Sequence, residues 1–369
     1  MTSMLYAELP GSASLAYAEV LDNALSRHIE TGEGFTFTSQ KRPGTAGRYW
    51  YLQHTLPRPK KRYYLGAETP ELLARIEQQK GRWAAGKVEA AVMERQVAMA
   101  IGAGCTPISY QAYKVLSAAG QSGLFRAGGV LVGSYAFLAI GNMLGVSWVR
   151  DTTMTQDIDF AASPECMLAV PGDRDPLRDT ILAADDELLE VPMLDHKKPS
   201  TSFMVRGKDF RVDVITPKIG AGKSPVFVPG IKSYAESVRF LEFVLEDTQK
   251  AVMLAKAGVV VNVPNPARFA LHKLVVSQRR TVSQRAKSKK DIKQAAQIIA
   301  VLLDQRPGDL WLALDAAVAF HDKFTRELEQ GIKLLEEELA GPLLEHLEAA
   351  KVACGSRWIR GAMLSAVCP

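Results

Sequence analysis

The chain has 369 residues, 47% of them hydrophobic and 23% charged, with a formal net charge of +5 at pH 7. This length and composition predict a soluble globular protein with two or three domains. No apolar run approaches the roughly 18 residues of a membrane span, and the first residues lack the basic segment of a secretory signal. The four cysteines and six histidines are dispersed without metal-ligand spacing, which indicates a reducing cytoplasm and argues against a zinc site.

Basic residues are concentrated in two stretches of the chain. Between Glu33 and Glu68 there are seven lysines and arginines and no acid. Between Arg268 and Lys293 there are nine, with only Asp291 against them. Such local excess of positive charge is typical of surfaces that meet phosphate groups.

The first hundred residues predict a helix, a β-hairpin and a second, longer helix. Apolar spacing indicates a helix over 13–31. Aromatic enrichment indicates strands over 48–56 and 61–66, with a proline-containing turn between them. A threonine followed by a proline opens the long helix predicted over 70–102.

From about residue 106, helical and strand patterns alternate, which favours a mixed sheet covered by helices. The predicted elements are, in order, a helix over 108–121, a strand over 127–133, a helix over 134–145, a strand over 155–162, two strands over 202–207 and 209–216, and a hairpin over 251–263.

The remainder of the chain is predominantly helical in pattern. We therefore predict an α+β fold with an N-terminal helix and β-hairpin region, a mixed-sheet core and a C-terminal helical domain. The predicted helices cover 267–280, 288–304, 308–320 and 322–350, and the predicted domains cover 1–100, 101–230 and 231–369.

The segment TQDIDF places two acids on a predicted strand. Residues i and i+2 of a strand point the same way, so Asp157 and Asp159 project together. Two such carboxylates in a partly dry cleft repel each other, and one of them tends to stay protonated. A hard divalent cation such as Mg²⁺ would relieve the repulsion. Taken alone, this motif is also common in loops and calcium sites.

Two further motifs could complete a site for metal and phosphate. Asp213 lies between two valines on a strand that could lie beside TQDIDF. Upstream, a predicted strand ends at Gly133 and Ser134 and a helix begins, so that helix N–H groups and a hydroxyl are available to a phosphate. Each motif alone is commonplace as a structural feature. Their order, with the third acid last, is distinctive.

In this order the motifs resemble those of the DNA polymerase β-type nucleotidyltransferase superfamily. The resemblance covers about residues 125–216 and is carried by VGSYAFLAIGNMLG, RDTTMTQDIDFA and FRVDVIT. It implies a nucleotidyltransferase-type mixed sheet with flanking helices. The whole chain also resembles an uncharacterised bacterial family with the nucleotidyltransferase fold.

The resemblance also implies roles for individual residues. Gly133 and Ser134 would hold the triphosphate of an NTP substrate. The catalytic acids Asp157, Asp159 and Asp213 would hold two Mg²⁺ ions.

The spacing of the motifs departs from the commonest pattern of that superfamily. Asp157 lies 24 residues after Gly133, and Arg150 precedes the acids, which is more similar to the abortive-infection toxin branch. The similarity extends to RFALHKLVVSQRR and KKDIKQAAQ and implies that Lys273 and Asp291 face the active site, with Lys273 holding the triphosphate. A solvated helix face is the alternative for Lys273.

Residues 220–224 read GAGKS, which invites comparison with a P-loop. That motif needs a glycine where Pro217 stands, and a helix after its lysine where PVFVPG follows. We therefore expect a loop, from which Lys223 could approach a triphosphate.

The basic stretch near the N-terminus alternates with aromatic residues, a pattern that suits stacking on unpaired bases and contact with phosphates. An ordinary hairpin with one aromatic face in the core is the alternative. The residues we expect to bind nucleic acid are Arg48, Trp50, Arg58, Lys60, Lys61 and Arg62.

Together these patterns predict a Mg²⁺-dependent nucleotidyltransferase that moves an NMP from an NTP to an acceptor hydroxyl and releases pyrophosphate. The basic stretches favour an RNA acceptor that is tRNA-like, and the branch resemblance implies a toxin–antitoxin-like role. Two alternatives stay open. One is a non-catalytic nucleic-acid-binding protein on the same scaffold, and the other is a transferase that acts on a protein side chain.

Overall fold

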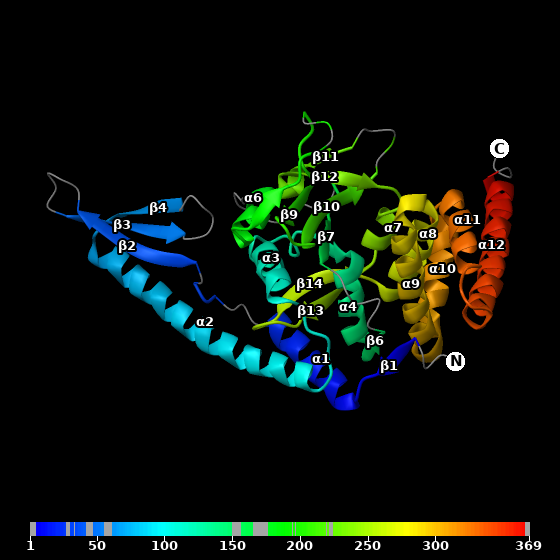
Figure 1. Ribbon diagram of the computed structural model, residues 1–369, viewed down its shortest axis with the longest axis horizontal. Coiled ribbons are helices and arrows are strands. Elements are labelled where there is room, and N and C mark those ends of the chain that lie inside the picture. Colours follow the sequence, from blue (N-terminus) through cyan, green and yellow to red (C-terminus); the bar gives the residue numbers. More distant parts are fainter. Residues whose placement is uncertain are drawn as a thin grey trace.

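A computed structural model describes most of the chain and shows an extended N-terminal part, a sheet-centred body and a group of C-terminal helices (Figure 1). The described residues contain no helix that could cross a membrane. The structure describes residues 5–26, 30–32, 34–41, 47–54, 61–149, 156–164, 176–193, 195, 197–218, 220 and 224–365. At 54, 61, 282 and 355–365 it describes the backbone only.

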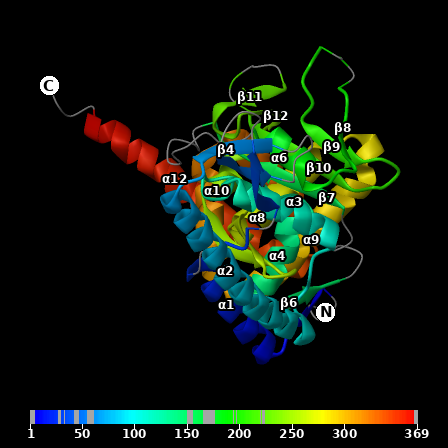
Figure 2. The same cartoon turned by 90° about the vertical axis from the view of Figure 1, so that its left-hand side faces the viewer.

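The N-terminal part is built on the 33-residue helix α2 (Pro70–Gly102), whose predicted bounds are confirmed. Thr69 caps it by accepting a hydrogen bond from a backbone N–H of the first turn. Toward its C-terminal end, α2 packs against α1 (Gly11–Ser26), and the two helices lie side by side along one edge of the body (Figures 1 and 2). Buried Met93 contributes to a small apolar cluster between them and the body.

A three-stranded antiparallel sheet, here called the arm sheet, lies at the other end of α2 (Figure 1). The predicted hairpin is confirmed and forms the second and third strands of this sheet. The first strand was not predicted from the sequence. Phe37 of that first strand stacks on Trp83 of α2, with ring centroids 5.0 Å apart. The strands are β2 (Phe35–Lys41), β3 (Arg48–His54) and β4 (Lys61–Ala67).

The body is organised around a seven-stranded mixed sheet, as predicted for the fold class. Its main path runs β11-β12-β10-β7-β5, with β9 paired to β10 and β8 paired to β9. Its strands are β5 (Val130–Val132), β7 (Asp157–Ala161), β8 (Leu188–Glu190), β9 (Ser202–Val205), β10 (Arg211–Pro217), β11 (Val226–Val228) and β12 (Ser233–Val238).

Two short antiparallel pairs accompany this sheet. The predicted hairpin over 251–263 is confirmed, and an additional pair links the N-terminus to the strand after α4. The strands are β13 (Thr248–Met253) with β14 (Val259–Pro264), and β1 (Tyr6–Glu8) with β6 (Val146–Trp148).

Helices cover the body and form its C-terminal side (Figure 1). The most extensive helix packing is between α8 and α9, and α8 also packs against α10 and α11. The helices and 3₁₀ turns are α3 (Tyr110–Gln121), α4 (Gly133–Leu144), α6 (Leu177–Ala184), η2 (Pro229–Ile231), α7 (Glu242–Leu245), α8 (Pro266–Arg279), η3 (Val282–Gln284), α9 (Arg285–Gln305), α10 (Pro307–Phe320), α11 (Asp322–Ile332) and α12 (Glu337–Ser365).

The single helix predicted over 322–350 is wrong, because the chain turns after Ile332 and begins α12 at Glu337. Gly331, in the last turn of α11, packs so closely on α8 that a Cβ there would lie 2.8 Å from Leu274. The turn then lets α12 pack against α10 as well as α11. Helical periodicity continues through such a turn, so the sequence pattern did not reveal it.

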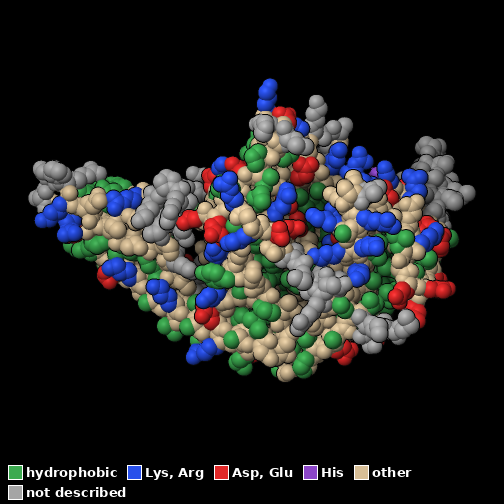
Figure 3. Space-filling view, in the orientation of Figure 1, with side chains coloured by type: hydrophobic (Ala, Val, Ile, Leu, Met, Phe, Trp, Pro, Cys, Tyr) green, Lys and Arg blue, Asp and Glu red, His purple; other side chains and the backbone are tan. Residues whose placement is uncertain are grey.

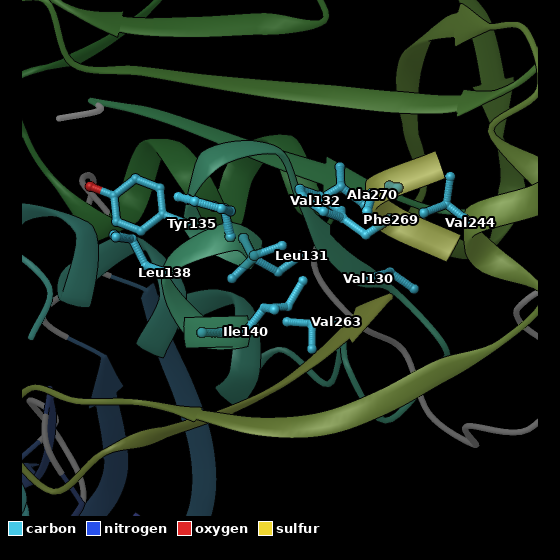
Figure 4. Close-up of a cluster of buried hydrophobic side chains, with 14 of the residues drawn as sticks. Val130, Leu131, Val132, Tyr135, Leu138, Ile140, Val244, Val263, Phe269 and Ala270 are labelled. Atoms are coloured by element: carbon cyan, nitrogen blue, oxygen red, sulfur yellow. The ribbon is translucent and has the colours of Figure 1, made fainter. Parts of the chain in front are cut away.

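The two faces of the sheet meet different helices. Val132 lies beside Phe269 of α8, whereas Leu131 points toward Ile140 of α4 (Figure 4). The main cluster of buried apolar side chains runs from Ala112 to Leu347, so the C-terminal helices share one core with the sheet. The division into three domains stays a prediction.

Candidate active site

Two strand registers bring the predicted acids together. Strand β7 lies between β5 and β10, so that Asp159 has Val132 as its partner on one side and Asp213 on the other. Partners in register project from the same face of a sheet, and so does Asp157, two residues earlier. This is the face that Val132 turns toward α8 (Figure 4), and by strand register the three acids are neighbours on it.

The carboxyl group of Asp159 is crowded by the other two acids and by Gly133. It is half-buried, and neither of its oxygens accepts a hydrogen bond from the residues that the structure describes. Burial, followed by the charges of Asp213 and Asp157, raises its pKa to about 7, against the opposing effect of Lys273. A carboxyl group of this kind is ready to exchange its proton for a cation near neutral pH.

Asp213 is held by two neighbours that the sequence analysis left out. Its Oδ1 accepts hydrogen bonds from Nε of Arg211, at 2.9 Å, and from the Ser202 hydroxyl. Arg211 also donates to the Ser202 oxygen at 2.9 Å, which closes the group. Oδ2 of Asp213 accepts no hydrogen bond from the described part of the chain, and this oxygen is the one available to a ligand.

Gly133 stands where β5 ends and α4 begins, pressed against Asp159. Its φ is +67°, in the left-handed region that favours glycine, and a Cβ there would lie 1.9 Å from Oδ2 of Asp159. No side chain among the described residues caps the N-terminus of α4, and Ser134 in its first turn is half-buried. The start of α4 therefore offers backbone N–H groups beside the acids.

We expect Gly133→Ala to reduce strongly the nucleotidyl transfer that the sequence resemblance implies, and to lower the free energy of unfolding by about 1–2 kcal/mol or more, because it adds backbone strain and displaces Asp159. Gly207→Ala is the matched control, since Gly207 also has a positive φ, +75°, but nothing within 4 Å of its Cβ position. Urea unfolding and a transfer assay on both variants measure the difference. Equal effects of the two substitutions would show that the contact with Asp159 is unimportant.

Lys273 faces the site from α8 in a buried ionic group. Its Nζ lies 2.6 Å from Oδ1 of Asp291 on α9, and Nε of Arg280 lies 3.1 Å from the other oxygen. The Lys273 and Asp291 side chains are only 12% and 5% exposed, so a solvated helix face does not describe Lys273. Although burial opposes ionisation, the two cations hold the pKa of Asp291 below its usual value.

Two further lysines approach the acids from the first turns of α9. Lys287 lies 4.0 Å from Oδ2 of Asp157, and Lys290 lies one turn further along the helix. Burial and the charge of Lys273 lower the pKa of Lys290. In the space-filling view, basic side chains gather where α8 and α9 lie (Figure 3). The basic run KSKK signalled a positive surface, but only the packing of α9 shows which lysines face the site.

The residues predicted to bind nucleic acid do not form one surface. Arg48 donates to Ser39, and Trp50 donates to Glu68, 2.9 Å away, on the face of the arm sheet that also carries Phe37. Arg62 lies on the opposite face. The structure does not describe Arg58, Lys60, Arg150 or Lys223, nor the side chain of Lys61. Strand β11 follows GAGKS in place of the helix that a P-loop needs.

A cavity of about 610 Å³ lies away from the acids. Phe203 and Val214 line it, and they alternate along their strands with Ser202 and Asp213, so they face the other side of the sheet. The acid cluster is not part of this cavity.

A nucleotidyltransferase family model matches residues 111–319, more than half of the chain. The chain belongs to this nucleotidyltransferase family. No curated protein and no solved structure matches it. The matched segment of the nucleotidyltransferase contains the three acids, Gly133 and the Lys273–Asp291 pair, whereas the arm sheet lies outside it.

The site residues offer the oxygen ligands that a divalent cation such as Mg²⁺ prefers. In the arrangement seen, the described residues contain no group of three potential ligands close enough to hold one ion together. Oδ1 of Asp213 is held by Arg211 and Ser202, which leaves Oδ2 as the oxygen that a cation could meet. The carboxylates of Asp157 and Asp159, with Oδ2 of Asp213, suit such a cation in chemical type. The crowding that raises the pKa of Asp159 is what a cation would relieve.

Proposed function

We propose that the protein is a Mg²⁺-dependent nucleotidyltransferase that moves an NMP from an NTP to a hydroxyl group of an RNA acceptor. The observation that carries this is the half-buried Asp159, placed by two strand registers beside Asp213 and against Gly133, within the matched family segment. Such repulsion between acids is difficult to account for in a protein that only binds a partner.

The triphosphate would lie between the start of α4 and the basic side chains of the C-terminal helices. Gly133 leaves room for a phosphate oxygen, and N–H groups of the first turn with the Ser134 hydroxyl would donate to it. Lys273, with Lys287 and Lys290 from α9, would balance the negative charge.

The acids would act on the acceptor and on the reacting phosphate. Asp157 and Asp159, with Oδ2 of Asp213, would hold Mg²⁺, which when bound supplies positive charge at the reacting phosphate and at the acceptor oxygen. Asp213 would lie nearest the acceptor hydroxyl and help remove its proton. The acceptor oxygen then forms a bond to the α-phosphorus, the bond from that phosphorus to the β-phosphate bridge breaks, and pyrophosphate leaves with the electron pair.

The test is transfer of label from α-³²P-NTPs to RNA or protein of a cell extract, with each NTP supplied separately. We expect label in RNA that depends on Mg²⁺ and is absent with γ-labelled NTP. Asp213→Asn should remove it, while Asp195→Asn, a change of an exposed acid in the segment before β9, should not. Label in protein would favour the protein-directed alternative. Metal-independent RNA binding with no label would favour the non-catalytic one.

The proposal of an RNA acceptor rests on the distribution of basic residues. Eight of the nine basic residues between Arg268 and Lys293 lie on α8 and α9, and two of these, Lys273 and Lys287, lie near the acids. A second basic stretch of the sequence includes strands of the arm sheet. An RNA strand crossing these surfaces would release counterions, so its binding should weaken steeply with salt. A toxin-like role, as in the abortive-infection branch, would appear as arrest of growth on expression that Asp213→Asn relieves.

A further inference from the structure

The arm sheet has one face turned away from α2. Phe37 stacks on Trp83 of α2, so the side chains that share its face, such as Leu52 in register with it, lie on the helix side. Side chains alternate along a strand, and the row of Thr38, Tyr51 and Tyr64 in register therefore projects from the opposite face.

We call this opposite face the tyrosine face, after the three rings that dominate it. The ring of Tyr64 lies 6.3 Å from that of Tyr49 and 5.6 Å from that of Tyr51, measured between centroids. The guanidinium of Arg62 lies 5.9 Å from the centre of the Tyr51 ring. Tyr64 is 56% exposed, although aromatic side chains usually lose most of their surface on folding. The face carries Thr38, Gln40, Tyr49, Tyr51, Arg62 and Tyr64, and also Gln53, whose amide oxygen accepts a hydrogen bond from Arg62.

The arm segment is basic in sequence, and among the described side chains Arg62 is the basic residue on this face. The sequence has no acid from residue 34 to residue 67 but seven lysines and arginines there. The nearest following acid, Glu68, accepts a hydrogen bond from Trp50 on the other face. The polar side chains of the tyrosine face are neutral amides and hydroxyls beside one arginine. Such a surface suits single-stranded RNA. Unpaired bases stack on aromatic rings and bond to amides, and phosphates bind arginine where no acid repels them.

We propose that the tyrosine face binds unpaired bases of single-stranded RNA, as a second contact for the acceptor apart from the acids. The identity of that RNA as acceptor rests on the proposed function, but the binding itself does not. The arm sheet and β7 lie well apart (Figure 1). The helix α2 that carries the sheet has 33 residues, about 50 Å at 1.5 Å per residue. The tyrosine face therefore holds the strand at a distance from the end that reacts, which favours long acceptors over short ones.

The test compares neighbouring tyrosines of one strand in the full-length protein, without NTP, by fluorescence anisotropy with a labelled single-stranded oligoribonucleotide. Tyr64→Ala should weaken binding by roughly tenfold, because it removes one stacking surface. Tyr64→Phe should bind like the unchanged protein, because the ring remains. Tyr63→Ala is the matched control, since Tyr63 is 45% exposed but pairs with Leu52 on the helix side.

Several results would overturn the proposal. They are an equal loss of affinity in Tyr63→Ala and Tyr64→Ala, no loss in Tyr64→Ala, or tighter binding of a duplex or of the DNA strand of the same sequence. Thermal unfolding of each variant shows whether the arm is intact. Binding that behaves as expected without any NMP transfer would leave this inference standing and remove the proposed function. If transfer persists on short acceptors while Tyr64→Ala binds RNA normally, the proposed function would stand and the inference about the tyrosine face would be removed.

Discussion

Asp159→Asn is expected to lower nucleotidyl transfer by roughly 10³-fold or more while making the metal-free protein more stable above neutral pH. The loss follows because the amide cannot supply the negative charge that holds a cation at the reacting phosphate. The gain follows because the folded protein keeps Asp159 among other acids without a hydrogen bond from the described residues. Removal of a functional charge commonly stabilises a site built for chemistry.

The pH dependence of this gain has a definite sign. The pKa of Asp159 is raised from its usual value of 3.8 to about 7 in the folded protein, so between these values the folded state binds more protons than the unfolded state. The free energy of unfolding therefore falls as pH rises through this window. At pH 5 only part of this window has been crossed, so the variant should have a smaller advantage than at pH 8, where it should be more stable by on the order of 1–3 kcal/mol.

Thermal unfolding in EDTA from pH 5 to pH 8 measures the effect. Asp157→Asn is the control, since that side chain is 42% exposed and lies 4.0 Å from Lys287, so its removal should give a smaller gain. Added Mg²⁺ should stabilise the unchanged protein more at pH 8 than at pH 5, where a proton occupies Asp159. A stability difference between Asp159→Asn and the unchanged protein that does not vary with pH would contradict the prediction.

Asp291→Ala is expected to have the largest effect on stability. Its carboxylate joins Lys273 and Arg280, and its removal leaves two cations facing each other in a largely buried setting. The free energy of unfolding should fall by about 3–5 kcal/mol. Transfer should also fall, measured at a temperature where the variant is folded, because Lys273 would no longer be held beside the acids.

Urea unfolding gives the stability, and Glu246→Ala provides a matched control, because Glu246 also pairs with a basic residue of α8. Glu246 pairs with Arg268 of α8 at 2.6 Å but is 66% exposed, so its removal should change the free energy of unfolding by about 1 kcal/mol or less. Asp291→Asn should lie between, because the amide keeps an oxygen for one of the two donors. Similar losses of unfolding free energy for Asp291→Ala and Glu246→Ala would show that the buried ionic group contributes no more to stability than an exposed ion pair.

Much of the site could be read from local patterns. Alternation placed Asp157 and Asp159 on one face, a glycine before a helix indicated close approach, and the aromatic runs of β3 and β4 gave the hairpin. Arg211 lies in the motif FRVDVIT, two residues before Asp213 on β10, but no role was predicted for it from the sequence. Ser202 lies in no distinctive motif and reaches Asp213 only through the pairing of β9 with β10. The arm residues were grouped by sequence, whereas the packing of Phe37 on Trp83 decides which of them share a face.

The sequence by itself determined the secondary structure around the site, the order of its motifs and the type of chemistry that three acids and a Gly-Ser turn can perform. Only the tertiary structure decided that Asp159 lies against Gly133, that α9 presents Lys287 to Asp157, and that Asp291 holds Lys273. The physical reason is that periodicity fixes the direction of a side chain within its own element. Which charges then meet, and how dry their surroundings are, depends on strand register and helix packing between segments far apart in the chain.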